Sequence, residues 1–194
     1  MRRLLIWAIV PVAALVGFAC GGGSGTGPSG TRGTMTLMMK DSPFTDAKAL
    51  LVTFSDVSIH RSDQPDSAWT KLPIAGGATG RTCDLKKLQT AQDVLGTGEL
   101  AAGHYTQVRL TVASAALYFD NPSVGTACAP AIAAPAGRSA PVDVPSGEVK
   151  LNREFDITGA TTTMLVDFDG DRSVRETGNN RYLMTPVIGV VSVQ

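Results

Sequence analysis

Residues 103–112 read Gly-His-Tyr-Thr-Gln-Val-Arg-Leu-Thr-Val, and their pattern is the clearest indication of the fold class. Its apolar and polar side chains alternate, which is the two-residue period of a strand with one buried face. The apolar set is Val108, Leu110 and Val112. The opposite set is Tyr105, Gln107 and Arg109. We therefore expect these last three side chains to share an exposed face.

The same period recurs before this stretch, in residues 35–39 and 50–59. In the second run Leu50, Val52 and Phe54 share one parity, whereas Val57 and Ile59 share the other. One extra residue between them would return both sets to the core, because successive side chains of a strand point to opposite faces. The change of phase predicts a β-bulge near Ser55-Asp56.

The period also recurs after this stretch, in residues 149–157 and 164–168. Thr158-Gly159-Ala160 between them has the composition of a turn, so we expect the two runs to form a hairpin. Residues 182–193 are apolar on both parities, which predicts a strand buried on both faces. Because Pro186 cannot donate a ladder hydrogen bond, this strand should lie at an edge or carry a bulge.

One segment has helical spacing instead. Leu85, Leu88, Gln92 and Leu95 recur at a spacing of three to four residues. Asp84 is a candidate N-cap and Gly96 lies just beyond the end, so the segment predicts a short helix. Residues 121–141 are rich in Ala, Pro and Gly and should form a long loop. Short strands separated by turns predict an antiparallel β-sandwich, immunoglobulin-like or transthyretin-like, of about seven to nine strands with at most one short helix.

The amino terminus has the pattern of an export signal. Met1-Arg2-Arg3 is followed by an apolar run to Ala19, which predicts a signal peptide over residues 1–19. Cys20 and the glycines after it resemble the start of a mature bacterial lipoprotein. That resemblance implies a lipid on Cys20 and an anchor at the cell envelope, in the outer membrane if the cell has two membranes. The alternative is ordinary cleavage after Ala19, which would release a soluble secreted protein.

A tether and a single domain follow the signal. Residues 20–33 are rich in Gly and Ser and have no apolar side chain to bury after the cysteine, so we expect a flexible tether. Residues 34–194 should form the β-sandwich domain. Export places Cys83 and Cys128 in an oxidising compartment, so we expect a disulfide between them.

The charge is balanced, with 17 Lys and Arg against 17 Asp and Glu. A protein that neutralises nucleic-acid phosphates needs a basic excess, so we expect no nucleic-acid partner. The expected partners are the membrane, through the lipid on Cys20, and an envelope protein or a glycan.

The densest carboxylate group consists of Asp167, Asp169 and Asp171. Two of these side chains would share one face of a strand, where calcium could bind, with Asp41 as a remote ligand. The spacing fails the EF-hand template, and Arg172 and Arg175 supply counter-charge. The competing interpretation is that the aspartates accept turn N–H bonds or pair with these arginines. Calcium is the one cofactor that the sequence suggests.

Two further sets of residues are candidates for chemistry. Tyr105, Gln107 and Arg109 offer an aromatic ring and hydrogen-bonding groups to a sugar or a peptide, although a solvated sheet face has the same composition. The histidines are His60, expected to be exposed, and His104, expected to be capping or partly buried. Neither lies in a G-x-S-x-G or H-E-x-x-H motif, so we expect no enzymatic activity.

Three segments taken together are distinctive. They are LAAGHYTQVRL (100–110), DFD (167–169) with SV (173–174), and YLMTPVI (182–188). They resemble an uncharacterised family, a domain of unknown function in exported lipoproteins of bacteria and archaea. Residues 38–43 and 52–59 look like its first two strands, so the resemblance covers about 34–193. It implies a β-rich extracytoplasmic domain but no activity or catalytic residue, and the loop around Cys128 is longer than the family's pattern.

The leading hypothesis is a non-catalytic envelope lipoprotein that displays a β-sandwich for adhesion, envelope assembly or ligand binding. The first alternative is a calcium-dependent carbohydrate- or protein-binding module that uses the three aspartates. The second is an extracytoplasmic hydrolase that uses His104 or His60.

Overall fold

The structure is a computed structural model in which residues 30–42 and 47–194 are described. Within these residues the chain forms thirteen strands and two single-turn helices. The strands are β1 (Arg32–Ser42), β2 (Ala49–Arg61), β3 (Trp69–Lys71), β4 (Arg81–Asp84), β5 (Asp93–Ala101), β6 (Gly103–Tyr118), β7 (Cys128–Ala129), β8 (Ser139–Asp143), β9 (Glu148–Ile157), β10 (Thr161–Asp169), β11 (Val174–Gly178), β12 (Arg181–Met184) and β13 (Ile188–Val193). The helices are α1 (Leu85–Leu88) and α2 (Gly170–Ser173).

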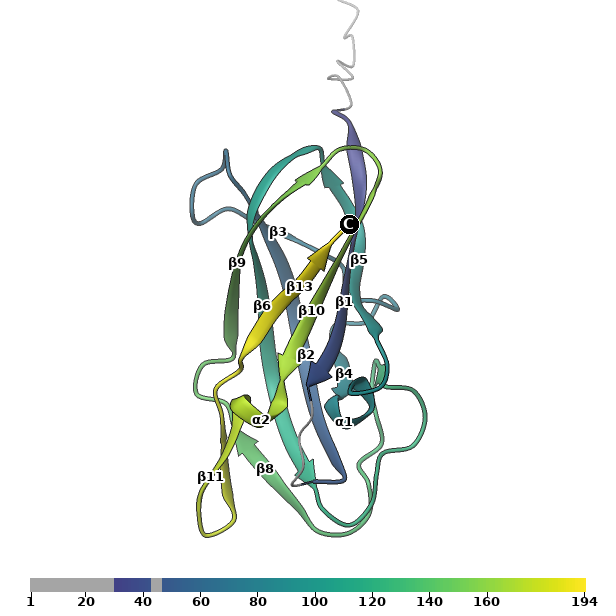
Figure 1. The fold of residues 1–194 in the computed structure, drawn as a ribbon, viewed down its shortest axis with the longest axis vertical. Coiled ribbons are helices and arrows are strands. Elements are labelled where there is room, and N and C mark those ends of the chain that lie inside the picture. Colours follow the sequence, from purple (N-terminus) through teal and green to yellow (C-terminus); the bar gives the residue numbers. More distant parts are fainter. Residues whose placement is uncertain (1–29, 43–46) are drawn as a thin grey trace, which may run out of the picture.

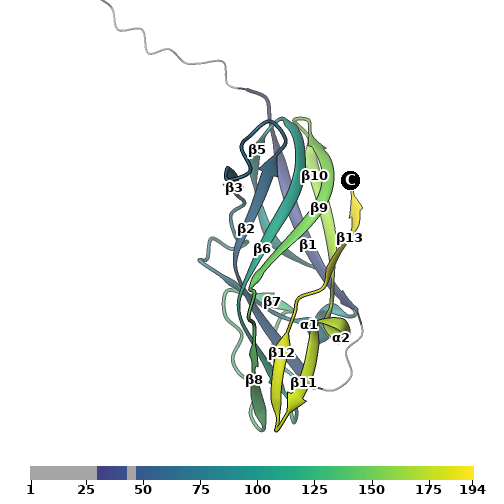
Figure 2. The same cartoon turned by 90° about the vertical axis from the view of Figure 1, so that its left-hand side faces the viewer.

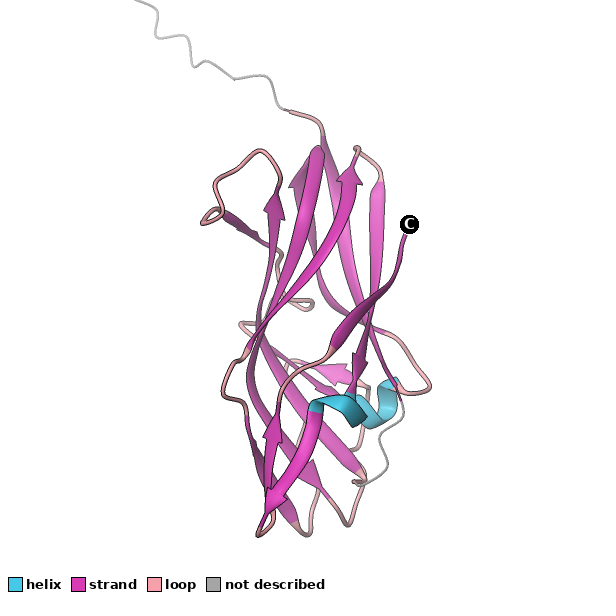
Figure 3. Ribbon diagram, turned by 60° about the vertical axis from the view of Figure 1, so that its left-hand side comes forward, coloured by secondary structure: helices cyan, strands magenta, loops and turns pink. Residues whose placement is uncertain are grey.

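The strands form two sheets that face each other in an elongated sandwich (Figures 1 and 2). The smaller sheet has the order β13-β10-β1-β5. The larger has the order β11-β12-β8-β6-β2-β4-β7, and β3 and β9 pair with β2 and β6. The long strands β2 and β6 run through most of the molecule, so each has different partners near its two ends (Figure 3).

The core lies between the two sheets and follows the predicted alternation. The fully buried side chains of β1 are Met35, Leu37 and Met39. The predicted apolar face of β6, from Val108 to Val112, is also buried. Phe54 of β2 meets Phe168 of β10 across the sandwich, with ring centroids 6.3 Å apart. Removal of this apolar surface from water is the main favourable term in folding.

The predicted bulge in β2 is confirmed. The pairing of β2 with β6 skips Ser55 between Phe54 and Asp56, and the Ser55 side chain is exposed. Phe54 and Val57 are both buried on either side of it. The extra residue therefore keeps both apolar sets of this strand in the core.

The all-β sandwich is confirmed, but the expectation of antiparallel pairing throughout is wrong. β1 pairs in parallel with β10, and β12 pairs in parallel with β8. The described residues also form more strands than the expected seven to nine, and a second helical turn, α2. Side-chain alternation reports which face is buried and not the direction of the partner strand, so it could not reveal the parallel pairs.

The predicted hairpin between residues 149–157 and 164–168 is wrong. β9 pairs with β6 in the larger sheet, whereas β10 pairs with β1 and β13 in the smaller one. Residues 158–160 therefore carry the chain from one sheet to the other. Gly159 has φ +115°, a backbone conformation that favours glycine.

The expectation that residues 182–193 form one strand buried on both faces is also wrong. β12 and β13 belong to different sheets, and the segment 185–187 between them contains Pro186. Most side chains of β12 and β13 are only half-buried or exposed. The proline ends one strand because it has no N–H to donate to the ladder, and the chain then crosses to the other sheet.

The predicted helix begins where expected but is much shorter. Asp84 is its N-cap, accepting a hydrogen bond from the backbone N–H of Lys86, and Leu85 and Leu88 are buried. The helix ends after one turn, and β5 begins at Asp93, so Leu95 is a core residue of a strand. Pairing with β1 thus overrides the helical spacing in the second half of this segment.

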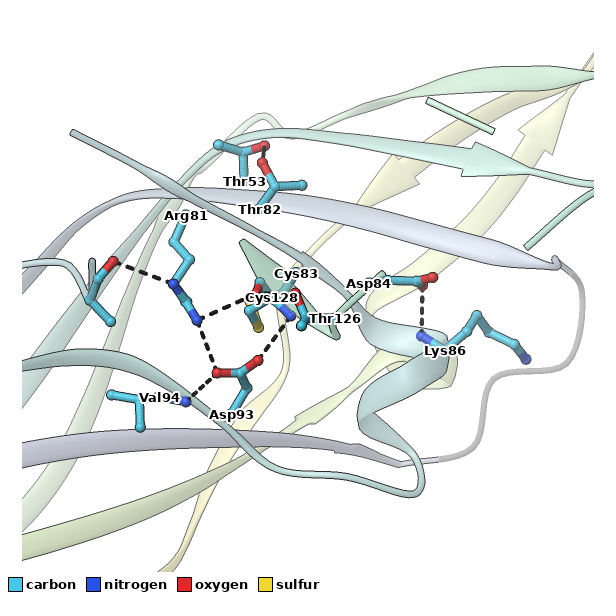
Figure 4. Close-up of a disulfide and its surroundings, with 11 residues drawn as sticks. Thr53, Arg81, Thr82, Cys83, Asp84, Lys86, Asp93, Val94, Thr126 and Cys128 are labelled. Carbon is cyan, nitrogen blue, oxygen red and sulfur yellow. Dashed lines mark hydrogen bonds and ion pairs between the residues drawn. A yellow bond between two sulfur atoms is a disulfide. The ribbon is translucent and has the colours of Figure 1, made fainter. Parts of the chain in front are cut away.

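The expected disulfide joins Cys83 of β4 to Cys128 of β7 (Figure 4). It fastens the long segment 121–141, which contains β7 and the start of β8, to the larger sheet. Beside it, Arg81 Nη2 lies 2.9 Å from Asp93 Oδ1. The other carboxylate oxygen of Asp93 accepts a hydrogen bond from the Cys128 backbone N–H at 3.0 Å.

β1 begins at Arg32, so Arg32 and Gly33 belong to the sheet and not to the predicted tether. The predicted signal peptide and Cys20 lie outside the described residues. In the described ranges, no helix has the length and apolar character needed to cross a membrane.

Candidate functional site

Tyr105 does not lie on the exposed face where the sequence placed it. The pairing of β6 with β9 skips Thr106, so Tyr105 turns into the core and is 2% exposed. Its ring stacks on Phe155, with centroids 5.5 Å apart, and its hydroxyl donates to the Ala101 carbonyl at 2.7 Å. Burial raises the pKa of the Tyr105 phenol above its usual value. The prediction that Tyr105 shares an exposed face with Gln107 and Arg109 is therefore wrong.

Gln107 and Arg109 do lie on the outer face of the larger sheet. The Gln107 side chain donates to Asn152 Oδ1 of β9 at 3.0 Å. Arg109 Nε donates to Ser58 Oγ at 3.2 Å, and its Nη1 lies 3.4 Å from Glu148 Oε2. Contacts to both neighbouring strands hold the guanidinium in place.

The aromatic ring of this face comes from Trp69. The Arg109 Cζ atom lies 4.3 Å from the centre of the indole, and the His60 ring centroid lies 5.3 Å from it. The indole N–H donates to the Asp66 carbonyl at 3.0 Å. We call the surface formed by His60, Trp69, Gln107, Arg109 and Lys150 the Trp69 face. Sequence patterns could not identify Trp69 as part of this face, because β3 has only three residues, too few to show a strand period.

Trp69 borders two neighbouring hollows. One, of about 290 Å³, is also lined by His60, Gln107 and Lys150. The other, of about 320 Å³, lies toward Arg61 and the start of β1. The indole therefore borders one recess on the outer face of the larger sheet and a second that is also lined by β1 and β5 of the smaller sheet.

His60 is 7% exposed, so the expectation that it is exposed is wrong. Its Nε2 atom lies 3.2 Å from the Pro65 carbonyl, and its Nδ1 atom lies 3.2 Å from Thr106 Oγ1. A carbonyl can only accept, so the Nε2–H group donates to Pro65. His60 thus fixes the loop that leads to Trp69.

Charge pairs of both signs surround the Trp69 face. Lys71 Nζ lies 2.8 Å from Asp56 Oδ1, and Lys150 Nζ lies 3.4 Å from Glu148 Oε1. Burial acts to raise the pKa of Asp56, but hydrogen bonds from Lys71 and Ser58 outweigh it and leave that pKa below its usual value. The rim is therefore polar and electrically balanced.

His104 is exposed, with 44% of its side chain accessible, which corrects the expectation of a partly buried residue. Its Nδ1 lies 2.8 Å from Asp156 Oδ1, and its Nε2 lies 4.0 Å from Glu154 Oε2. Both ring nitrogens thus face carboxylates. A hydrolase would need a nucleophile beside one of them.

The three aspartates proposed as calcium ligands have separate roles. Asp167 Oδ2 lies 3.0 Å from Lys40 Nζ. Asp169 caps α2 by accepting a hydrogen bond from the Arg172 N–H, and Asp171 is exposed. Among the described residues, no group of three or more acidic, His or Cys side chains is arranged to hold a metal. This geometry favours the capping and pairing interpretation.

Asp41, the suggested remote ligand, is a buried carboxyl near this group. It is 3% exposed, and its Oδ1 accepts a hydrogen bond from the Gly170 N–H at 3.1 Å. Burial is the main cause that raises its pKa to about 7, and the charges of Asp167 and Asp169 add to the effect.

Fold and surface together define an all-β sandwich protein with a pre-formed aromatic and cationic face. Residues 32–186 match the model of the domain of unknown function DUF4382, so the chain belongs to that family. A search of curated proteins gave no significant match. A search of solved structures gave none either.

Proposed function

We propose that this protein is an exported, lipid-anchored and non-catalytic binding protein of the cell envelope. The export pattern of residues 1–19 and the lipoprotein-like Cys20 support the location. The observation that carries the binding role is Trp69 packed against Arg109 on an outer sheet face. Trp and Arg are the residues most enriched among the anchors of protein interfaces.

The Trp69 face suits a protein partner better than a sugar. The Arg109 guanidinium covers the indole at 4.3 Å, so this aromatic surface is already occupied by a cation. The surrounding Asp56–Lys71 and Glu148–Lys150 pairs form the polar rim that is typical of protein interfaces. We infer that the partner is an envelope protein that lays a flat surface over Trp69.

Site-specific photo-crosslinking in intact cells tests this role. A photoreactive side chain at Gln107 should give one discrete protein adduct, whereas the same group at the exposed Glu176 of β11 should not. Trp69→Ala, with the probe kept at position 107, should abolish the adduct. The proposal is wrong if the adduct persists in Trp69→Ala or forms equally at position 176.

The calcium-dependent alternative rests on Asp167, Asp169 and Asp171. It is less favoured because Asp167 already pairs with Lys40 and Asp169 already caps α2. The hydrolase alternative is less favoured because the His104 ring contacts two carboxylates.

A further inference from the structure

β8 and β11 lie at the end of the sandwich opposite the entry of β1 (Figures 1 and 2). A pocket of about 550 Å³ is lined by residues of β8 and β12 and by Phe119. We call this end of the sandwich the tip, and its pocket is lined by Phe119, residues 138–141, Asn180 and Tyr182. The volume lies within the range of about 300–1,000 Å³ that is usual for small-molecule sites. The tip is distant from the Trp69 face, because β3 pairs with the other half of β2.

The pocket exists because β8 and β12 separate. Their parallel pairing covers only Val142 with Tyr182 and Asp143 with Leu183. Toward the start of both strands, at Ser139 and Asn180, this pairing is absent and the pocket opens. Asn179 and Asn180 have φ of 54° and 56°, the two positive values that a tight type I′ hairpin turn requires. This turn fixes one wall of the pocket.

The other wall carries a guanidinium that is held in place. Asp120 Oδ2 accepts a hydrogen bond from the Arg138 backbone N–H at 2.7 Å. Asp120 Oδ1 lies 3.0 Å from both Nε and Nη2 of the same arginine. The backbone hydrogen bond, followed by the side-chain bond, holds the pKa of Asp120 below its usual value. Arg138 is nevertheless 78% exposed, so it remains accessible as a donor.

Gly137 is needed for this arrangement. It has φ +103°, and a Cβ atom on it would lie 2.6 Å from Asp120 Oδ2. A side chain there would displace the carboxylate that orients Arg138. The backbone therefore builds the Asp120–Arg138 pair into the tip.

The third component is a pair of half-buried aromatic rings. Phe119 and Tyr182 have ring centroids 5.8 Å apart at an interplanar angle of 41°. The Arg138 Cζ atom lies 5.8 Å from the Phe119 centroid, farther away than Arg109 lies from Trp69. The pocket thus combines apolar ring surface with the donors of Arg138, Ser139 and Asn180.

We propose that the tip pocket binds a neutral pyranose ring of a glycan. The C–H face of a sugar is apolar and packs on aromatic rings, while its hydroxyls need donors and acceptors held in fixed positions. Arg138, held by Asp120, supplies a donor, and the side chains of Ser139 and Asn180 supply acceptors. Because Asp120 compensates the charge of Arg138, the site favours an uncharged polyhydroxyl ligand over a free anion.

Calorimetric titration of the purified exported protein tests the site. The probes are maltohexaose, cellohexaose, xylohexaose and chitohexaose, with a polygalacturonate oligomer as the anionic arm. We expect at least one neutral oligosaccharide to bind. Arg138→Ala should weaken that binding by about ten- to a hundredfold, the loss expected for a hydrogen bond from a charged donor. Tyr182→Ala should abolish it, whereas Tyr182→Phe should retain the ring packing and most of the affinity.

Trp69 supplies an internal control. The chain has two tryptophans, and Trp7 lies in the predicted signal peptide, so Trp69 is the indole of the exported protein. Sugar binding at the tip should leave the Trp69 emission unchanged, and Trp69→Ala should bind the sugar as the parent does. Failure at the tip would thus leave the proposed protein docking at the Trp69 face intact.

Three outcomes overturn the proposal. The first is that no neutral oligosaccharide binds. The second is that Arg138→Ala and Tyr182→Ala bind the oligosaccharide as tightly as the parent protein does. The third is that only the polygalacturonate oligomer binds. Melting curves of each variant show whether it is folded. Arg138→Lys is a second variant, which keeps the positive charge but loses the planar set of guanidinium N–H donors.

Discussion

Asp41 makes stability depend on pH at the scale of one residue. Its pKa is about 7 in the folded protein and has the ordinary value of 3.8 when exposed, so the folded state holds the extra proton between these pH values. The stability that Asp41 contributes to the folded state is therefore fully present below about pH 4 and is lost as the pH rises through 7.

Asp41→Asn should remove this dependence, because the amide stays neutral and keeps an oxygen for the Gly170 N–H. We expect the advantage of the variant over the parent to grow by about 3 kcal/mol between pH 5 and pH 8. Thermal melting at the two pH values measures it. Asp171→Asn, at an exposed carboxyl, is the control, and a parallel pH response of Asp41→Asn and the parent would contradict the assignment.

Asp167 carries the test of the calcium alternative. Because its carboxylate pairs with Lys40 at 3.0 Å, we expect the melting temperature to be the same in millimolar calcium and in chelator. Ligand at a hundredfold its dissociation constant would stabilise the folded state by about 2.7 kcal/mol, a shift of several degrees. A calcium-dependent rise that disappears in Asp167→Asn would establish the calcium-binding module instead.

At the scale of an element, the bulge at Ser55 decides whether β2 can bury both of its apolar sets. Deleting Ser55 would invert the facing of one set, so that either Phe54 or Val57 would point outward. We expect the deletion variant to lose its cooperative thermal transition in circular dichroism. Ser55→Ala should change the free energy of unfolding by less than about 0.5 kcal/mol, because the Ser55 side chain is exposed. A deletion variant that melts like Ser55→Ala would show that the bulge is dispensable.

At the scale of the whole molecule, the disulfide restrains a long excursion of the chain. Cys83 and Cys128 are 45 positions apart, and the chain-entropy model gives about 4 kcal/mol for a loop of this length. The double variant Cys83→Ala with Cys128→Ala should therefore melt roughly 10 °C below the parent under non-reducing conditions. Adding reductant should lower the parent toward the variant and leave the variant unchanged. Equal melting temperatures for oxidised and reduced parent would contradict this role.

Three features could be predicted from the sequence alone: the β-sandwich class, the bulge at Ser55 and the Cys83–Cys128 pair. Each depends on local information: the two-residue period, a change of its phase, or the oxidising compartment that the predicted signal peptide would imply. The same information placed Gln107 and Arg109 on an outer face. It also identified the Asp84 cap, because capping involves residues close together in the chain.

The pairing of the strands and the neighbours of the predicted residues could be learned only from the three-dimensional structure. The period does not reveal the direction or identity of a partner strand, so the parallel β1–β10 pair and the separation of β9 from β10 were not foreseeable. One skipped residue at Thr106 turned Tyr105 inward, and a three-residue strand brought Trp69 to Arg109 instead. The tip pocket likewise joins Phe119, Arg138 and Tyr182 from three separate segments. Such contacts depend on long-range pairing, which a pattern confined to neighbouring residues does not encode.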